Sequence, residues 1–507
     1  MTDETKRKGR PWIGLAFLCL TVFNLAEDDG VLSLALPSIS NEFQSSTGEL
    51  QWTINAYLLA FAALLLTMGA LGDRFGRKRM LQVGLILFGV SSLAAALSTS
   101  MGMLIACRAL MGVAGAITLP QTLSIIRATF ADPKERTKAI GVWAGVFALG
   151  YGIGPVVGGV LLEYFEWYSV FLLNIPMVIV AFAGGHFFIG ESRDQDAPRL
   201  DPLGVFLSIA GLFAVVYGII KAGEESWTDG SVIALLSGGA ILLLIFAWWE
   251  KRSDHPMLPM RFFKNMSFTG ANIAMTLAAF GTFAILFFFT QYLQSVQGHS
   301  PLAAAVRILP IGVLAMLAAL AAAPIARAIG VKLPVSLGLF ICAGGLFYLS
   351  FAETDTNYMV ILAGLALVAV GYGLAWSPAV DSIMGSLPER RAGIGAAMDS
   401  TTQMIGGALG VAALGAILNT MYLDKIESLK TLADLPVGAY ETIQGSIQGA
   451  HIVAGQLPDI SQQIIDGSNA AFTSGQSEAM LIGAIVMAAA SLVSLLIMPT
   501  RIRLTEE

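Results

Sequence analysis

A few charged side chains fall inside long apolar stretches of this sequence, where a charge is costly and needs a reason. Asp28 lies in the first stretch and Arg108 in the fourth. Along a helix, Asp28 lies about 24 Å from the start of its stretch and Arg108 about 9 Å from the start of its own. If the two stretches cross a membrane in opposite directions, both side chains reach a similar depth. We therefore expect an ion pair, and protonation of Asp28 would release Arg108 and act as a switch.

Two further acids, Glu27 and Asp29, flank Asp28. Successive helix residues point about 100° apart, so the three carboxylates cannot all face one cavity. Crowded carboxylates also raise one another's proton affinity. One hypothesis is that Asp28 couples to protons while a flanking acid attracts a cationic substrate. The alternative is that Glu27 or Asp29 only extends to the outer surface.

A third buried acid and a set of aromatic residues suit a cation. Asp399 lies about 12 Å into the thirteenth stretch, and intramembrane acids are functional candidates by default. Phenylalanines cover all faces of the ninth stretch, and Phe283 and Phe287 could stack on a flat cation. Packing in the core or against lipid is the alternative for each ring. The whole set is Phe280, Phe283, Phe287, Phe288 and Phe289.

The composition requires lipid as the solvent. Of the 507 residues, 56% are hydrophobic and 13% are charged, whereas soluble domains carry about 25% charged residues. The apolar stretches are long enough for helices that cross a hydrocarbon core of about 30 Å, and too long for barrel strands. We expect fourteen spans, at residues 12–37, 51–71, 80–98, 102–126, 138–163, 168–190, 203–221, 231–250, 266–292, 302–326, 333–352, 359–386, 393–421 and 479–499.

The loops between these spans alternate in basic charge. The two tails and the even-numbered loops hold nearly all Lys and Arg residues, for example Arg199, Arg390, Arg391 and Arg503. The odd-numbered loops hold only Lys221, Lys425 and Lys430. Because basic residues collect on the cytoplasmic side, both ends are expected inside the cell.

Three segments are expected. Residues 1–190 form a six-helix bundle, residues 191–265 an inserted helix pair, and residues 266–507 a second six-helix bundle. The second bundle includes an extracellular loop at 422–478, whose apolar residues recur at helical spacing on both sides of Pro458. This spacing predicts a hairpin of two short amphipathic helices over the outer mouth, with a flexible loop as the alternative. A weak repeat matches Gly76 and Lys78 with Gly330 and Lys332, as in transporters built from internal repeats.

Two glycine motifs join the charged residues. The loop after the second span contains Gly69, Gly72, Asp73, Arg74, Gly76 and Arg77. The fifth span carries Gly141, Gly150, Gly154, Pro155, Gly158 and Gly159. A spacing of four puts Gly150, Gly154 and Gly158 on one helix face, where glycine allows close helix approach. Pro155 removes a backbone donor and bends the helix, which suits a hinge or a seam between moving halves, with a packing groove as the alternative.

Together with Arg108-x-x-x-Gly112, these motifs resemble the major facilitator superfamily, and the glycine set of the fifth span is similar to its antiporter signature. Fourteen spans and Trp52-x-x-x-x-Tyr57 resemble its drug:proton antiporters, and the long outer loop resembles their QacA-type pumps for quaternary ammonium compounds. The resemblance implies proton coupling at Asp28 and Arg108, a cation site at Asp399, and a place for Tyr57 among the substrate-binding residues. It also implies a cytoplasmic latch at Asp73. Ala315 stands where pumps for divalent cations carry an extra acid, which puts divalent substrates in doubt.

The expected function is proton-coupled antiport that exports lipophilic cationic drugs, dyes and quaternary ammonium compounds by alternating access. The alternatives are a dedicated exporter of one endogenous metabolite or antibiotic, and a non-transporting receptor or assembly subunit. The expected location is the bacterial cytoplasmic membrane, with small lipophilic cations and protons as ligands and a monomer as the working state. The sequence offers no nucleophile with a base, metal-ligand spacing, nucleotide-binding loop or nucleic-acid stripe, so we expect no enzyme activity, cofactor or nucleic-acid partner.

Overall fold

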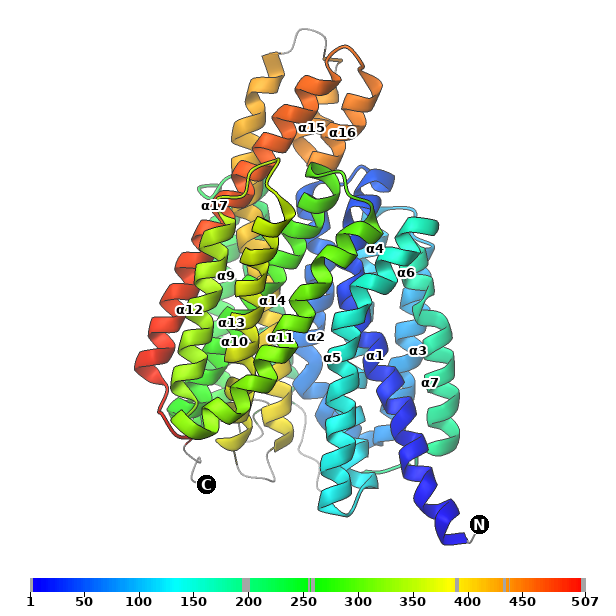
Figure 1. The fold of residues 1–507 in the computed structure, drawn as a ribbon. Coiled ribbons are helices and arrows are strands. Elements are labelled where there is room, and N and C mark those ends of the chain that lie inside the picture. Colours follow the sequence, from blue (N-terminus) through cyan, green and yellow to red (C-terminus); the bar gives the residue numbers. More distant parts are fainter. Residues whose placement is uncertain are drawn as a thin grey trace.

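A computed structural model describes residues 3–193, 201–253, 256, 260–387, 392–431, 435–436 and 438–502. Every element in these ranges is helical, and most run roughly parallel or antiparallel through one bundle (Figure 1). Arg199, Arg390, Arg391 and Arg503, which contribute to the charge alternation, lie outside the described residues. The long helices are α1 (Asp3–Phe43), α2 (Thr47–Phe75), α3 (Arg77–Ala96), α4 (Met101–Thr129), α5 (Pro133–Tyr164), α7 (Asn174–Phe188), α8 (Pro202–Glu224), α9 (Gly230–Arg252), α10 (Met266–Gln291), α11 (Pro301–Ile329), α12 (Lys332–Leu349), α13 (Tyr358–Gly385), α14 (Ala392–Ile426) and α17 (Ser461–Ile497).

Twelve described helices are long and apolar enough to cross a membrane, or thirteen if α2, which bends by 55° between Leu65 and Thr67, counts as one span. The short helix α6 (Ser169–Leu172) and α7 act together as one of the twelve. Helix α1 is not among them, and its three consecutive acids lower its hydropathy. The expected number of fourteen spans is therefore not confirmed by length and composition.

Side-chain caps fix where many of these helices begin. Ser46 accepts a hydrogen bond from the Glu49 amide, and Glu49 accepts one from the Ser46 amide, so a capping box starts α2. Asp132 caps α5 and Ser300 caps α11, each followed directly by a proline. Such caps satisfy backbone donors that a helix start leaves free, and proline has no donor to lose there.

The two glycines of the weak repeat occupy matching joints. Gly76 has φ 113° between α2 and α3, and Gly330 has φ 88° at the end of α11, just before α12. Both values lie in the region that favours glycine over residues with a side chain. The repeat therefore corresponds to a glycine with positive φ between two consecutive helices, in both parts of the chain.

The helices pack in two groups. The N-terminal group, α1–α7, pairs α1 with α5 and α4 with both α2 and α3. The C-terminal group, α10–α14 with α17, pairs α10 with α14, α11 with α13, and α12 with α13 and α17. Helix α8 packs on α9, α14 and α2, while α2–α14 and α5–α11 are the main pairs between the groups. Glycines make several pairs close; a Cβ on Gly410 of α14 would lie 2.0 Å from the Phe280 carbonyl of α10.

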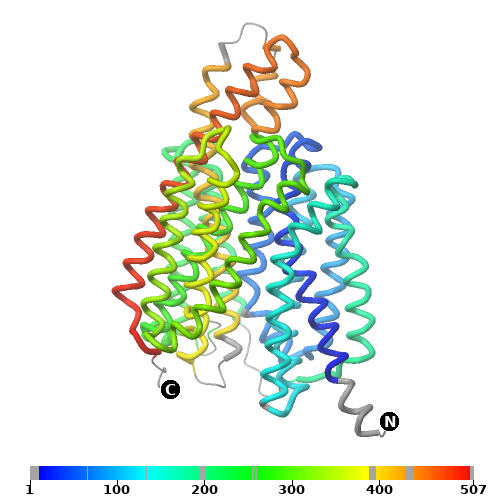
Figure 2. Tube along the Cα trace, in the orientation of Figure 1, coloured from blue at the N-terminus to red at the C-terminus, as the bar shows by residue number. Residues whose placement is uncertain are grey.

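A helical hairpin projects from one end of the bundle, opposite the end where α1 begins and α17 finishes (Figures 1 and 2). We call these the hairpin end and the terminal end. The hairpin contains α15 (Ala439–Gly445) and α16 (Ile447–Gln456) between the extended ends of α14 and α17. Residues 432–434 and 437 of the expected loop lie outside the described residues.

The helices of this hairpin differ from the predicted pair. The run before Pro458 is divided at Ser446 into α15 and α16, because the Ser446 side chain caps a new helix there. The run after Pro458, with Ile460 and Ile464, leads directly into α17, which starts at Ser461. No proline interrupts α17, so the predicted second helix and the last span form one helix.

Candidate functional site

The expected ion pair forms in the interior of the N-terminal group. Arg108 Nη1 lies 2.5 Å from Asp28 Oδ2, and the side chains are 1% and 4% exposed. Arg108 Nε also donates to the Thr53 carbonyl at 3.2 Å. The guanidinium lies over the Tyr57 ring, 4.4 Å from its centroid. Removing one partner of a buried pair leaves an uncompensated charge, which typically costs about 3–5 kcal/mol.

An amide network holds the second oxygen of Asp28. Asn174 Nδ2 donates to Asp28 Oδ1 at 2.9 Å, and the same nitrogen lies 3.0 Å from Ser92 Oγ. Asn24 Nδ2 donates to Asn174 Oδ1 at 2.5 Å. Asn24 and Asn174 are both buried. Sequence reasoning missed them, although an asparagine in an apolar span is itself a signal, because a buried amide needs partners.

The glycine face of α5 positions the acids on α1. A Cβ on Gly150 would lie 2.7 Å from Ala26 Cβ, and one on Gly154 would lie 2.9 Å from the Glu27 carbonyl. A Cβ on Gly158 would lie 2.7 Å from Val31. The two helices thus touch backbone to backbone beside the acids, which only small residues allow.

The rest of that motif divides between other roles. Pro155 packs against Gly30, where a Cβ would lie 3.0 Å from the proline ring. A Cβ on Gly159 would lie 2.6 Å from Ala305 on α11, so this glycine faces the C-terminal group. A Cβ on Gly141 would meet no atom within 4 Å. The face is therefore mainly a seam inside one group, with Gly159 at the boundary between the groups.

The two flanking acids occupy different surroundings. Glu27 is 1% exposed, so it does not extend to a surface. Neither of its carboxylate oxygens has a partner of good hydrogen-bond geometry among the described residues, although Asn24 lies close enough to interact weakly. Asp29 is half-buried and accepts a hydrogen bond from the Tyr151 hydroxyl of α5 at 2.9 Å. The alternative that Glu27 only extends to the outer surface is therefore wrong.

Two aromatic candidates for substrate binding are buried in the hydrophobic core. Tyr57 is 1% exposed and sits between Arg108 and Phe61. Phe287 is fully buried in the core of the C-terminal group. Phe283 is half-buried, and a Cβ on Gly407 of α14 would lie 2.9 Å from its ring. The packing alternative therefore fits Phe287. The Tyr57 ring lies against the Arg108 guanidinium.

The third acid lies in the C-terminal group. Asp399 is half-buried on α14, and its Oδ1 is buried without a hydrogen-bond partner among the described residues. Gln403, one turn along α14, interacts with this carboxyl group and accepts a hydrogen bond from the Tyr372 hydroxyl of α13 at 3.3 Å. Asp399 and Asp28 are thus held by different groups of helices.

The Asp73 cluster lies near the terminal end. Asp73 Oδ1 accepts from Arg77 at 2.9 Å (Nε) and 2.8 Å (Nη2). A Cβ on Gly72 would meet the Gln121 side chain, and one on Gly69 would lie 3.6 Å from Pro120, both on α4. Arg74 is exposed above Phe75, and Gly76 lies against Glu191. All these contacts stay inside the N-terminal group.

The two groups meet at the hairpin end. The Leu302 amide of α11 lies 3.3 Å from Glu163 of α5, and Gln294 donates to the Leu34 carbonyl of α1 at 3.0 Å. Thr47 donates to the Gly445 carbonyl of the hairpin at 3.3 Å. Nearer the terminal end, a Cβ on Gly145 of α5 would meet nothing within 4 Å, as at Gly141. These hydrogen bonds between the two groups thus lie toward the hairpin end.

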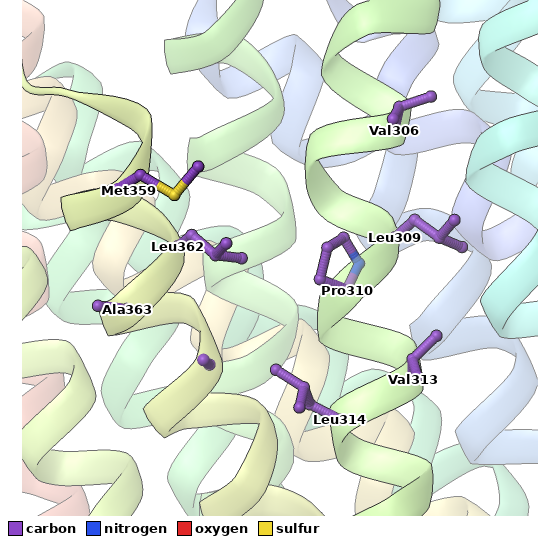
Figure 3. Close-up of a pocket in the computed structure, with 9 residues that line it drawn as sticks. Val306, Leu309, Pro310, Val313, Leu314, Met359, Leu362 and Ala363 are labelled. Atoms are coloured by element: carbon purple, nitrogen blue, oxygen red, sulfur yellow. The ribbon is translucent and has the colours of Figure 1, made fainter.

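An apolar groove lies away from these acids, between α11 and α13 (Figure 3). It has a volume of about 730 Å³, and all of its lining residues are apolar. Val306 is 52% exposed and Met359 67%. A groove without polar groups cannot orient a cation, so we assign it to contact with lipid. The lining residues are Val306, Leu309, Pro310, Val313, Leu314, Met359, Leu362, Ala363 and Ala366.

Comparison with known proteins decides the family. Residues 17–411 match the model of the Major Facilitator Superfamily. The chain belongs to the major facilitator superfamily. It is 35% identical to the multidrug efflux pump LfrA of Mycolicibacterium smegmatis over 97% of each chain. It is 32% identical to the methyl viologen resistance protein SmvA of Salmonella typhimurium over 93% of this chain and 95% of that one. The protein is therefore a membrane transporter related to drug exporters, and not an enzyme.

A solved structure shares the fold. A bacterial homologue of the human lysosomal transporter Spinster, described as inward-facing and unoccupied, superposes with a TM-score of 0.67 over 96% of each chain. The identity is 15%, so this likeness concerns the fold alone.

Proposed function

We propose that this transporter is a proton-coupled antiporter that exports lipophilic cationic drugs, dyes and quaternary ammonium compounds. The observation that carries the proposal is the Asp28–Arg108 pair, buried at 4% and 1% exposure. An acid in a low-dielectric interior ionises readily only while a cation is beside it. Protonation of Asp28 would cancel its charge and leave Arg108 free to seek another partner.

This switch would alternate the access of the two groups. In the present form they meet at the hairpin end. Asp28 sits on the α1–α5 seam, and both helices also contact α11 of the other group. A change in the charge pair can therefore bias how α1 and α5 seat against α11. Residues 1–190 and 266–507 would rock against each other, with 191–265 as the inserted pair.

The same proposal includes the topology. We infer fourteen spans, with α1 as the first despite its acids, in the bacterial cytoplasmic membrane. The basic residues of the tails and even-numbered loops support a cytoplasmic terminal end. The hairpin then lies outside the cell, and the present form opens inward. The Asp73 cluster would latch onto the C-terminal group when the protein opens outward, and a monomer would be the working unit.

A dedicated exporter is the second candidate, because a tetracenomycin C resistance and export protein of Streptomyces glaucescens is 30% identical over 96% of this chain. Competition separates the two candidates. A multidrug pump should show mutual inhibition between ethidium and structurally unrelated cations, whereas a dedicated exporter should transport one compound that such cations do not displace.

The function is tested with purified protein in liposomes that carry an imposed pH gradient. Ethidium should accumulate in the acidic lumen of vesicles in which the cytoplasmic face points outward, because outward proton flow then drives uptake. Nigericin in potassium buffer, which collapses the gradient, should abolish accumulation. Accumulation that is insensitive to nigericin would contradict proton coupling.

Replacing Asp399 with Asn should reduce transport of dications more than transport of monocations. Loss of one negative charge in a partly desolvated site weakens a dication more than a monocation. Uptake of methyl viologen should therefore fall about tenfold relative to uptake of ethidium. Asp381→Asn, an exposed acid on the neighbouring helix α13, is the matched control and should leave the ratio unchanged. Equal loss for both substrates would make Asp399 a structural residue.

A further inference from the structure

Arg307 is a charged residue of the apolar helix α11 that has no acidic partner among the described residues. It is half-buried, and none of the ion pairs in the described ranges includes it. The acids of the loop before α13, Glu353 and Asp355, are exposed and do not pair with it. An arginine in a membrane helix is costly unless an opposite charge or the membrane surface receives it. Arg307 therefore requires an anion that the described residues do not supply.

The guanidinium of Arg307 keeps most of its donors for such an anion. A guanidinium carries several N–H groups in a planar fork. Within the described ranges, the side-chain hydrogen bond that uses them runs from Nη1 to the Ala303 carbonyl at 3.0 Å. Nε is buried and has no hydrogen-bond partner there. Buried donors without a partner are rare in proteins, and each one requires an explanation.

The contacts of Arg307 place its guanidinium near the hairpin end of α11 and α13. It lies over the ring of Tyr358, the first residue of α13, at 5.5 Å from the ring centroid. The Tyr358 hydroxyl donates to the Arg307 carbonyl at 3.0 Å, which ties the two helices together at this level. Ala303, the acceptor of Nη1, is one turn nearer to the start of α11. The side chain thus extends back toward the membrane surface, where lipid phosphate groups lie.

The apolar groove between α11 and α13 starts beside this guanidinium. Val306 and Met359, the sequence neighbours of Arg307 and Tyr358, line one end of the groove (Figure 3). From Val306 to Leu314 the groove follows α11 over a rise of about 12 Å. One leaflet of the hydrocarbon core is about 15 Å deep. The groove therefore matches the length of one acyl chain within one leaflet.

The groove opens toward the bilayer and does not face the N-terminal group. Ala305 is the residue of α11 that meets α5, because a Cβ on Gly159 would lie 2.6 Å from Ala305 Cβ. The groove residues Val306 and Val313 are 52% and 45% exposed. A cationic substrate does not fit here, because Arg307 would repel it. A molecule that arrives from the bilayer with an anionic head and an apolar chain fits both the charge and the groove.

We propose that this place is a binding site for a phospholipid, with the phosphate group on Arg307 and one acyl chain in the groove between α11 and α13. Guanidinium groups recognise phosphate through parallel charge-assisted hydrogen bonds. The acyl chain would cover Val306 and Met359, which are otherwise exposed. The site is independent of the proposed antiport, and only its place in the outer leaflet depends on the proposed topology.

Native mass spectrometry of purified, delipidated protein in detergent measures this binding without any gradient. The probes are dioleoylphosphatidylglycerol, dioleoylglycerol, which has the same chains and no phosphate, and inorganic phosphate, which has no chain. Dioleoylglycerol should bind at least about tenfold more weakly than dioleoylphosphatidylglycerol. Inorganic phosphate should not displace the phospholipid. Displacement by inorganic phosphate, or equal binding of the two lipids, would overturn the site.

Two substitutions test the head and the chain separately. Arg307→Gln removes the charge and should raise the Kd for dioleoylphosphatidylglycerol at least about tenfold. Arg307→Lys keeps the charge and should raise it less than about threefold. Ala363→Phe fills an exposed part of the groove and should raise it about tenfold. An unchanged Kd in Arg307→Gln or in Ala363→Phe would contradict the proposal.

Helix α9 supplies a matched control for each half of the site. Arg252 is an exposed arginine that lies over the Trp248 ring at 4.6 Å, and Ala240 is an exposed alanine. Arg252→Gln and Ala240→Phe should leave the Kd unchanged. If they weakened binding as much as the substitutions at positions 307 and 363, the lipid would bind the apolar surface in general and the site would be refuted. Melting temperatures without lipid show that each variant is folded, and Ala363→Phe tests the site even if Arg307→Gln does not fold.

Discussion

Asp28→Asn should abolish uptake of ethidium driven by a pH gradient, down to the level of protein-free liposomes. Asparagine can still accept a hydrogen bond from Arg108 and can face Asn174, so the local geometry has a substitute. It cannot carry a charge or take up a proton, so proton binding can no longer change the charge beside Arg108. Initial rates in proteoliposomes, with and without the gradient, measure the effect.

Folding and binding must be separated from coupling in this variant. Arg108 keeps its bond to Thr53 and its ring contact with Tyr57, so Asp28→Asn should cost less than the full 3–5 kcal/mol of a broken buried pair. Ethidium binding in detergent should persist. Asp424→Asn, an exposed acid near the end of α14, is the control. Wild-type uptake by Asp28→Asn would remove Asp28 from the mechanism.

Gly154→Val should disrupt the seam that holds the acids. A Cβ at this position would lie 2.9 Å from the Glu27 carbonyl and 3.0 Å from Glu27 Cα. Backbone atoms cannot turn aside as a side chain can, so α1 and α5 must separate. Overpacking costs about 1–3 kcal/mol, and a shift of α1 also moves Asp28 away from Arg108. We expect a lower melting temperature and uptake reduced by at least about tenfold, with Gly154→Ala intermediate.

The same helix offers two controls. A Cβ on Gly152 or on Gly141 would meet no atom within 4 Å, so Gly152→Ala and Gly141→Ala should transport and melt like the wild type. Gly141 is the sharper control because it belongs to the signature by sequence. If Gly141→Ala failed and Gly154→Val did not, contact with α1 would not explain the glycine face.

Much of the candidate site could be predicted because a charge in lipid is rare and expensive. Asp28 and Arg108 stand out for that reason, and equal depth was enough to pair them. Asn24 and Asn174 were missed because a neutral amide gives a weaker signal, and its partners lie up to 150 positions away.

In the fold, too, some features could be predicted from the sequence and others could not. Apolar length predicts helices, but it placed the starts of the second and fifth spans five and six residues after the caps at Ser46 and Asp132. Length did not predict that α17 reaches back to Ser461, because its first turns pack on the hairpin instead of lipid. His451 of α16, for example, bonds with Asn469 of α17 at 2.8 Å. Phe287 looked like a possible ligand contact because sequence alone does not say which face of α10 meets α14.

Proton movement in exchange for substrate is the most direct test of the central claim. Proteoliposomes with an internal pH-sensitive dye receive an inward gradient of ethidium and no initial pH gradient. Exchange through a protonated Asp28 predicts that the lumen becomes alkaline as ethidium enters, and that Asp28→Asn shows no change. Entry of ethidium without any change in lumenal pH, or the same alkalinisation in Asp28→Asn, would contradict the account.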